Sequence, residues 1–425
     1  MTLVTAALVK SLNNVMGSFH SMAVGLQEPE TLLAVKGIQL ASVASGIKKN
    51  NTDDLVLIEI EEGSQCAAVF TKNKFCAAPV TLSKKHLKLS TPRYLLINSG
   101  NANAGTGEQG MADALKSCEL VAQQFGCDAE QVLPFSTGVI GENLPVDKIA
   151  ASMGNLQSEL SADNWLAAGR GIMTTDTKLK GVSRQLELQG KTVTVTGLSK
   201  GAGMIQPNMA TMLAYIATDA AISEEVLQKC ITDAVNVSFN SITVDSDTST
   251  NDACVLMATG QAGNDLIDSA DENYEQLYKV INEVFLMLAQ AIIRDAEGAT
   301  KFVSLQVNKA KSIEDARQVA YTVAHSPLVK TALFASDPNW GRILAAVGRS
   351  GVDFNITEIK IFLGDVCIVS NGGRDPLYTE EQGQEIMKQA EILIQIELNT
   401  GNKSVCIWTS DLSYEYVKIN AEYRS

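Results

Sequence analysis

The sequence predicts an α+β fold in which layered sheets and helices are built from two intertwined halves. The strand-like segments tend to come in hairpin-like pairs, and clean strand-helix-strand repeats are few. This pattern favours separate layers over a parallel doubly wound sheet. At 425 residues the chain is also long for a single hydrophobic core, which favours either two domains or two closely packed halves.

Strands are expected where short apolar or alternating segments are bounded by turn residues. These segments are residues 55–60, 67–71, 94–98, 358–363, 404–409 and 414–419. Residues 184–196 alternate apolar and polar side chains on both sides of Gln189-Gly190, which predicts a hairpin.

Helices are expected where apolar residues recur every three or four positions. This spacing is found at residues 111–125, 145–156, 223–235, 274–294 and 379–394. The last segment opens with a Thr379-x-x-Gln382 capping box.

Composition limits the partners and the compartment. The formal charge of −14 argues against nucleic acid or an anionic membrane as a main partner. The longest apolar run, residues 284–293, is broken by Gln290 and is shorter than the ~18 residues of a membrane helix. Residues 1–10 lack the basic segment of a secretion signal. The eight cysteines show no Cys-x-x-Cys spacing, so we expect reduced thiols in the cytoplasm and no metal site.

The segment from residue 200 to residue 219 presents a threonine in an unusual setting. A Gly-Ala-Gly loop and a proline lead to Ala210, Thr211 and an apolar run. By itself this pattern is typical of a loop that enters a strand. If the bond between Ala210 and Thr211 were cut, however, Thr211 would carry a free α-amine beside its hydroxyl. An N-terminal amine with a pKa of ~8 is a suitable base for such a nucleophile.

Histidine is too scarce to supply the usual base. The three histidines, which lie in no recognisable nucleophile motif, are His20, His86 and His325. A Ser-His-Asp or Cys-His arrangement is therefore poorly supported, and nucleophilic chemistry in this chain needs another base.

Other motifs are less specific. Residues 105–110 match G-x-G-x-x-G after a strand, but no acidic strand end follows at the spacing of a dinucleotide site, so a structural turn is favoured. Residues 245–252 fail as a calcium loop, since the sixth position is not glycine, and fit a hydrogen-bonded loop at a strand end better. Residues 135–143 predict a glycine-bounded polar turn. Such a turn can direct N–H groups at an oxyanion, but this pattern by itself is more often only a structural turn.

Taken in order, ten segments of the chain form a specific set. They lie at residues 46–48, 70–71 together with 77–80, 97–107, 136–141, 173–177, 200–220, 245–252, 297–301, 337–342 and 416–425. Together they resemble the ornithine acetyltransferase family of arginine biosynthesis, also called glutamate N-acetyltransferases. The resemblance runs from about residue 32 to the C-terminus, and its specificity lies in the ordered set rather than in any one motif.

The resemblance implies a self-processing enzyme of the N-terminal-nucleophile type. The precursor would cleave itself between Ala210 and Thr211 into an α chain, residues 31–210, and a β chain, residues 211–425. The two chains would stay together and form a heterotetramer of two α and two β chains. Residues 1–30 form an extension, longer than the family usually has, to which the resemblance assigns no role.

The resemblance also implies the chemistry. Thr211 would take the acetyl group from N-acetylornithine and hold it as an ester until the amine of glutamate accepts it. Thr137 and Gly138 would stabilise the oxyanion. No cofactor is implied, and acetyl-CoA is a candidate co-substrate because bifunctional and monofunctional members share these motifs.

The substrate contacts that carry over from the family pattern are Thr174, Lys200, Thr211, Glu297, Asn420 and Ser425. One cation and one anion suit an acetylated amino acid that carries a carboxylate and a distal ammonium. Lys200 and Glu297 supply these charges, and the sequence leaves open which charge meets which group. Ser425 stands where threonine is also common, and it keeps the hydroxyl.

Two alternatives remain open at this stage. A self-cleaving N-terminal-nucleophile amidohydrolase or aminopeptidase would use the same threonine but pass the acyl group to water. A non-catalytic nucleotide-binding module would instead use residues 105–110.

Overall fold

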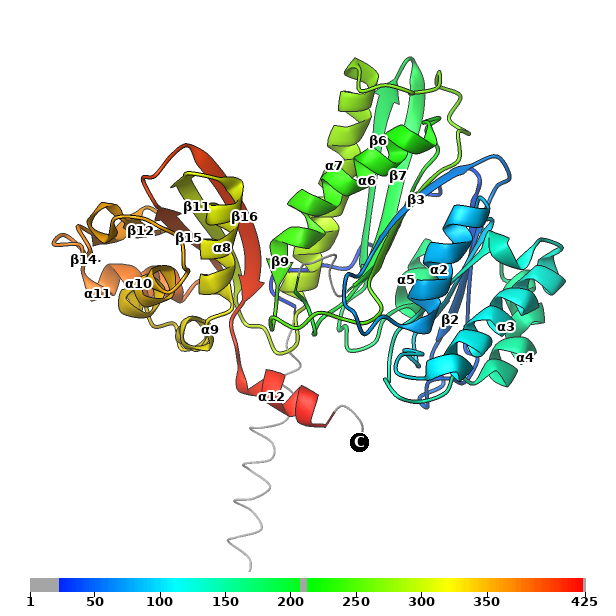
Figure 1. The fold of residues 1–425 in the computed structure, drawn as a ribbon, viewed down its shortest axis with the longest axis horizontal. Coiled ribbons are helices and arrows are strands. Elements are labelled where there is room, and N and C mark those ends of the chain that lie inside the picture. Colours follow the sequence, from blue (N-terminus) through cyan, green and yellow to red (C-terminus); the bar gives the residue numbers. More distant parts are fainter. Residues whose placement is uncertain (1–22, 207–211, 423–425) are drawn as a thin grey trace, which may run out of the picture.

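The computed structural model describes residues 23–206 and 212–422, and these form three sheets surrounded by helices (Figure 1). Sheets and helices occupy separate layers, so the predicted α+β class is confirmed. Three of the predicted cleavage, catalytic and substrate-binding residues lie outside the described ranges, namely Ala210, Thr211 and Ser425, and so does His20.

Two of the sheets lie in the larger body of the molecule. The four-stranded sheet has the order β1 (Ile38–Val43), β2 (Leu55–Ile60), β4 (Tyr94–Asn98) and β5 (Val132–Ser136). The five-stranded sheet has the order β3 (Gln65–Phe70), β10 (Ala253–Ala258), β8 (Leu213–Thr218), β7 (Lys191–Lys200) and β6 (Lys180–Leu188).

Alternating side chains pack these two sheets into four layers. Leu213 and Tyr215 of β8 share a core with Ile38 and Leu95 of the four-stranded sheet, while Ile216 points the other way. That other face is covered by α6 (Glu224–Val237) and α7 (Glu272–Arg294). The outer face of the four-stranded sheet is covered by α2 (Ala78–Leu89), α3 (Gly107–Phe125) and α4 (Val146–Ser158). The order is therefore helix, sheet, sheet, helix.

The five-stranded sheet joins segments from both sides of residue 210. Its central strand β8 pairs with β7 in antiparallel fashion on one side and with β10 in parallel on the other. A short helix, α5 (Trp165–Gly171), packs beside β1 and β7. Since β3, β6 and β7 precede residue 210 while β8 and β10 follow it, the two halves of the chain share one sheet.

The C-terminal lobe contains the third sheet and its own core (Figure 1). Its strand order is β14 (Gly373–Arg374), β13 (Val366–Ser370), β12 (Lys360–Leu363), β15 (Glu391–Glu397), β11 (Phe302–Ala310), β16 (Lys403–Ser410) and β9 (Ile242–Thr243). Its helices are α8 (Ile313–Ala324), α9 (Pro327–Phe334), α10 (Trp340–Gly348) and α11 (Glu380–Met387). After β16 the chain leaves this lobe and forms α12 (Tyr414–Ala421).

Helix α7 is the only helix in the described part of the chain that is long and apolar enough to cross a membrane. It packs against β6 and β7, and Leu277, Ile281 and Leu288 are buried there. Its apolar character is therefore explained by its place in the core.

The predicted hairpin at residues 184–196 is confirmed. Strands β6 and β7 pair up to Leu188 and Lys191, and the turn residues Gln189 and Gly190 have φ values of 54° and 71°. Two consecutive positive φ values match the turn type that suits the twist of a two-residue hairpin.

Two predicted elements are wrong. The helix expected at residues 379–394 ends after Met387, because residues 391–397 alternate buried Ile392, Ile394 and Ile396 and form β15 between β11 and β12. The strand expected at residues 414–419 is helix α12. Its alternating sequence resembled a strand, but the Ser413 hydroxyl accepts a hydrogen bond from the backbone N–H of residue 416 and caps a helix.

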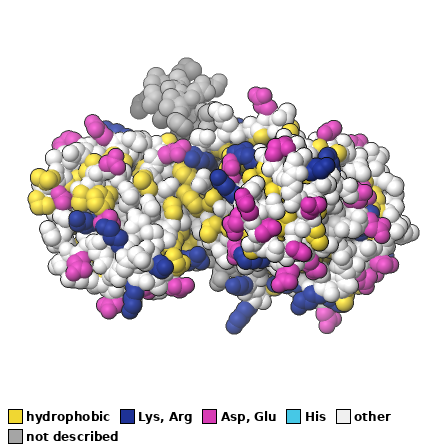
Figure 2. Space-filling view, turned by 90° about the horizontal axis from the view of Figure 1, so that it is seen from above, with side chains coloured by type: hydrophobic (Ala, Val, Ile, Leu, Met, Phe, Trp, Pro, Cys, Tyr) yellow, Lys and Arg dark blue, Asp and Glu magenta, His cyan; other side chains and the backbone are white. Residues whose placement is uncertain are grey.

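Acidic and basic side chains are interspersed on the surface seen in Figure 2. That face shows no large patch of one sign. Such a surface favours solubility more than the binding of a polyanion.

Candidate active site

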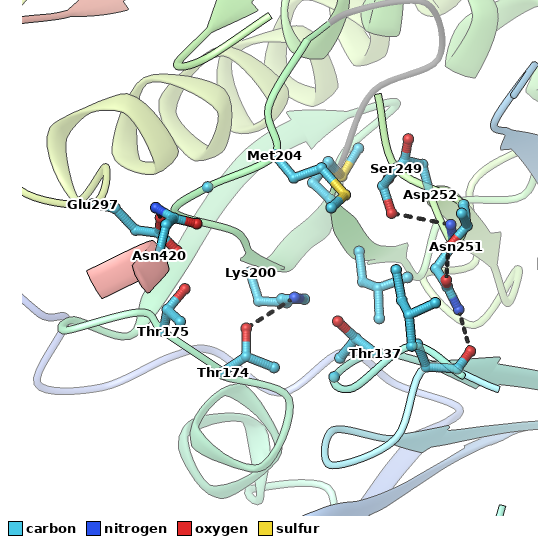
Figure 3. Close-up of a pocket in the computed structure, with 17 residues that line it drawn as sticks. Thr137, Thr174, Thr175, Lys200, Met204, Ser249, Asn251, Asp252, Glu297 and Asn420 are labelled. Carbon is cyan, nitrogen blue, oxygen red and sulfur yellow. Dashed lines mark hydrogen bonds between the residues drawn. The ribbon is translucent and has the colours of Figure 1, made fainter. Parts of the chain in front are cut away.

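A cavity of about 280 Å³ lies where the two halves of the chain meet (Figure 3). Met212 and Leu213, which follow Thr211 in the sequence, line it. Six of the residues predicted to act in catalysis or substrate binding also line it, namely Thr137, Gly138, Thr174, Lys200, Glu297 and Asn420. The structure therefore brings together every predicted site residue that it describes.

The predicted oxyanion turn follows β5. The backbone N–H of Thr137 donates a hydrogen bond to the carbonyl oxygen of Asn98 at 2.9 Å, so this group is occupied and the Thr137 hydroxyl is the donor left to the cavity. Gly138 has a φ of 131°, and a Cβ there would lie 2.5 Å from the carbonyl carbon of Gly100. Only glycine fits, because the two loops touch at their backbones.

Asn251 fixes this turn from the other half of the chain. Its Nδ2 donates hydrogen bonds to the carbonyl oxygens of Ala102 at 2.6 Å and Ser136 at 2.9 Å. Ser136 directly precedes the Thr137-Gly138 turn, and the N–H of Ala102 donates to the carbonyl oxygen of Val139, which directly follows it, at 2.9 Å. Ala102, Ser136 and Asn251 are all buried. The sequence showed only a polar loop at residues 245–252, and this long-range role was missed.

The glycine-rich motif at residues 105–110 is filled by the side chains of Asn103 and Thr106. The Thr106 hydroxyl donates to Oδ1 of Asn103 at 2.8 Å, and Nδ2 of Asn103 donates to the Gly110 carbonyl at 2.9 Å. A Cβ at Gly110 would collide with both side chains. These contacts support the structural turn that the sequence favoured.

Lys200 ends β7 and extends into the cavity. Its Nζ donates to the hydroxyl of Thr174 at 3.1 Å (Figure 3). Burial lowers the pKa of Lys200, while the nearby Asp176 carboxylate acts in the opposite direction. A desolvated ammonium of this kind is suited to pairing with a carboxylate or another anionic group.

A buried ion triad supports the Thr174 turn. Nζ of Lys180 lies 2.6 Å from a carboxylate oxygen of Asp176 and 2.6 Å from one of Asp295. Asp176 also accepts hydrogen bonds from the backbone N–H groups of Thr174 at 2.9 Å and Gly201 at 2.7 Å. Burial alone would raise the pKa of Asp176, but the charges of Lys180 and Lys200 hold it well below its usual range.

Glu297 lies across the cavity from Lys200 (Figure 3). Its Oε2 accepts a hydrogen bond of 2.7 Å from Nδ2 of Asn420, which lies on α12. Burial raises the pKa of Glu297, although hydrogen bonds from Asn420 and Thr175 act in the opposite direction. The last helix thus returns to the cavity and contacts its acidic side.

Asp245 holds the loop that follows β7. Its Oδ1 accepts from the N–H of Ile205 at 2.9 Å, and its Oδ2 accepts from the N–H of Met204 at 2.6 Å. Oδ2 also accepts from the hydroxyl of Tyr416 on α12 at 3.0 Å. This link between three distant segments was not predicted, because no local sequence pattern indicates it.

Asp252 is a further cavity residue that the sequence analysis did not single out. It is 2% exposed, and its Oδ2 makes no hydrogen bond to any described residue. Burial raises its pKa well above the ordinary value, against hydrogen bonds from the N–H of Met212 and from Ser249 and against the charge of Lys200.

The sequence model of the ArgJ family matches residues 39–425. The chain belongs to this family. It is 57% identical over 406 residues to the arginine biosynthesis bifunctional protein ArgJ of Pseudomonas syringae pv. tomato, and this match covers 95% of the chain and all of the relative. A protein of the same name from Methylococcus capsulatus is 55% identical over 395 residues, which cover 93% of the chain and 97% of that relative.

A solved structure of an ArgJ family member is also similar. The crystal structure of the arginine biosynthesis bifunctional protein ArgJ from Bacillus halodurans is 39% identical and has a TM-score of 0.48. It covers 50% of this chain and all of that chain.

Proposed function

We propose that this ArgJ family chain is a glutamate N-acetyltransferase. It moves the acetyl group of N2-acetyl-L-ornithine to L-glutamate and gives L-ornithine and N-acetyl-L-glutamate, a reaction of the arginine biosynthesis cycle. The names of its relatives, arginine biosynthesis bifunctional proteins, support this assignment.

One observation of the structure carries the proposal. The cavity at the start of β8 combines a hydroxyl and a glycine N–H from one turn with a cation and an anion on separate segments. These are Thr137, Gly138, Lys200 and Glu297. Such a cavity offers donors for an oxyanion and opposite charges for an amino acid, which is the requirement of transfer between two amino acids.

The proposed nucleophile is Thr211, released by self-cleavage after Ala210. Its hydroxyl oxygen attacks the acetyl carbonyl carbon, and its own α-amine accepts the hydroxyl proton. The hydroxyl of Thr137 and the N–H of Gly138 stabilise the negative oxygen, a contribution of roughly 3 to 4 kcal/mol per donor. Ornithine leaves, and the acetyl-threonine ester waits for glutamate.

Substrate positioning is assigned to residues on both sides of the cavity and at the end of the chain. Lys200 and Glu297 provide the charges, and Thr174, Asn420 and Ser425 complete the set. Because α12 carries Asn420 and donates to Glu297, a long extension after residue 425 is expected to lower activity.

The remaining expectations belong to the same proposal. The α chain of residues 31–210 and the β chain of residues 211–425 remain associated in a cytoplasmic heterotetramer. No cofactor takes part, and acetyl-CoA serves as a second acetyl donor in line with the word bifunctional in the names of the relatives.

Two assays test the proposal. Ornithine release from N-acetylornithine should depend on glutamate, whereas an N-terminal-nucleophile hydrolase would release ornithine equally well without it. In the second assay, glutamate is incubated with acetyl-CoA, and formation of N-acetylglutamate is the expected result. Release that is indifferent to glutamate would assign the hydrolase function instead.

A further inference from the structure

Self-cleavage poses a chemical problem that later turnovers do not have. Before the bond after Ala210 breaks, the nitrogen of Thr211 is an amide and cannot act as a base. The first reaction therefore needs another group to accept the hydroxyl proton and to protonate the departing nitrogen.

The described histidines are engaged elsewhere. Nδ1 of His86 lies 2.8 Å from the carbonyl oxygen of Val132, beneath α2, and Nε2 of His325 lies 3.0 Å from the hydroxyl of Thr243. Neither lines the cavity. The proton acceptor should therefore be sought among the titratable groups that do.

Among the described residues, three titratable side chains line the cavity. Lys200 donates to Thr174, and Glu297 accepts from Asn420. Asp252 differs from both, because its buried Oδ2 has no hydrogen-bond partner among the described residues. A buried carboxyl oxygen without a partner is costly to the folded state and is a feature that calls for a chemical role.

The register of the sheet places Asp252 beside the start of β8. Ala253 of β10 pairs with Leu213 of β8, and its N–H donates to the Met212 carbonyl at 3.1 Å. Asp252 is therefore level with Met212, the residue that follows Thr211 in the sequence, on a strand about 4.8 Å away. On the other side of β8, Lys200 pairs with Leu213.

We propose that Asp252 is the proton carrier of self-cleavage. The hydroxyl oxygen of Thr211 forms a bond to the carbonyl carbon of Ala210, and the Asp252 carboxylate accepts the hydroxyl proton. The carbon–nitrogen bond then breaks, and the protonated Asp252 returns this proton to the departing nitrogen. Water hydrolyses the resulting ester and leaves a carboxylate on Ala210 and a free hydroxyl and amine on Thr211. This inference rests on the proposed self-cleavage.

The surroundings of Asp252 suit both protonation states. The charged group that acts on it is Lys200 on β7, while the segments after β3 and before β8 contribute uncharged groups of Thr71 and Met212. Burial raises the pKa of the carboxyl well above its ordinary value, which makes the carboxylate a stronger proton acceptor than an exposed aspartate. Since the base form is the carboxylate, the cleavage rate should rise as the pH rises through this pKa and then level off.

The chain offers a matched control at the other end of β8. Asp219 is 1% exposed, follows β8, and accepts from the N–H of Thr194 at 2.7 Å. It does not line the cavity. Asp219→Asn therefore makes the same chemical change in a carboxyl that is 1% exposed, against 2% for Asp252, but at the far end of β8 and away from the proposed proton path.

The experiment follows cleavage of the full chain after cell-free synthesis, by denaturing electrophoresis over a series of pH values. Asp252→Asn should cleave at least about 100-fold more slowly than the wild type, and its cleavage rate should no longer depend on pH. Asp219→Asn should cleave at the wild-type rate. Asp252→Glu should recover cleavage with an altered pH profile.

Folding is controlled by comparing the uncut Asp252→Asn chain with the uncut Thr211→Ala chain in thermal unfolding. Equal unfolding temperatures assign the loss to proton transfer. If Asp252→Asn unfolds at a lower temperature than Thr211→Ala, the Asp252→Glu variant provides the test. A Glu variant that folds but stays uncut overturns the proposal. Cleavage of Asp252→Asn at the wild-type rate, or equal slowing in Asp219→Asn, also overturns it. A wild-type chain that stays uncut would instead overturn the proposed function.

Discussion

The hydroxyl of Tyr416 donates a hydrogen bond of 3.0 Å to the carboxylate of Asp245. The same carboxylate oxygen accepts from the N–H of Met204, four residues beyond the end of β7. This partly buried contact thus joins the last helix of the chain to the loop that leads toward the predicted cleavage point. Since Asn420 lies one turn further along α12 and donates to Glu297, this contact also supports the acidic side of the cavity.

Loss of the tyrosine hydroxyl should loosen α12 without removing a cavity residue. In Tyr416→Phe we expect the KM for N-acetylornithine to rise about fivefold, the equivalent of a hydrogen bond worth ~1 kcal/mol. Self-cleavage should be unchanged, because Asp245 still binds the 204–205 backbone. Tyr414→Phe is the control, since Tyr414 is 83% exposed on the same helix. An unaltered KM in Tyr416→Phe would show that the contact does not position α12.

The Thr137 hydroxyl should act on the transition state rather than on the bound substrate. Thr137→Ala is expected to lower kcat by roughly 100- to 1,000-fold with little change in KM. Thr137→Ser keeps the hydroxyl and should stay within about tenfold of the wild type. Steady-state kinetics of fully cleaved enzyme provide the measurement, and a serine variant as slow as the alanine variant would exclude this role.

Glu297 should impose a pH dependence on donor binding. Its pKa is raised, so it becomes protonated at a higher pH than an ordinary glutamate as the pH falls. A neutral Glu297 attracts the distal ammonium of N-acetylornithine less well, so the KM should rise as the pH falls through this pKa. Glu297→Gln should have a KM roughly tenfold or more above the wild type at neutral pH, independent of pH in this range. The control, Glu415→Gln on the exposed side of α12, should keep the wild-type dependence of KM on pH. If the KM of Glu297→Gln still rises as the pH falls, another group causes the pH dependence.

Replacing the buried Lys180 should destabilise the protein much more than replacing the exposed Lys229. Lys180→Met leaves the carboxylates of Asp176 and Asp295 facing each other without a cation, and we expect a loss of about 3 to 5 kcal/mol in the free energy of unfolding. Lys229→Met removes an exposed ion pair with Asp233 and should change the free energy of unfolding by less than about 1 kcal/mol. Urea denaturation of uncut Thr211→Ala chains compares the two, and equal effects would contradict the assignment.

Local patterns were sufficient for much of the fold. The apolar run after Thr211 was read as a strand entered from a loop, and β8 is the central strand of its sheet. The error at residues 391–394 arose because a capping box at Thr379 was extended through an alternating segment that belongs to the next sheet. The short helix α12 has no buried residues, so its sequence shows little helical periodicity.

The site residues that belong to the family motifs could be predicted from the sequence. The supporting contacts could not, because they join residues far apart in the sequence. Asn251 reaches a turn more than a hundred residues earlier, and Asp245 meets Tyr416 across 171 positions. No spacing rule in a single sequence predicts such pairs. Asp252 escaped notice for the same reason, since its lack of a partner is visible only in three dimensions.

Intact-mass spectrometry tests the central claim most directly. Purified wild-type protein is incubated with N-acetylornithine in the absence of glutamate, and each chain is weighed before and after glutamate is added. We predict two chains: the α chain with the extension of residues 1–30 still attached, and the β chain of residues 211–425. The β chain should carry one acetyl group that disappears when glutamate is added. A single uncut chain that still transfers acetyl groups, or turnover without an acetylated second chain, would contradict the account.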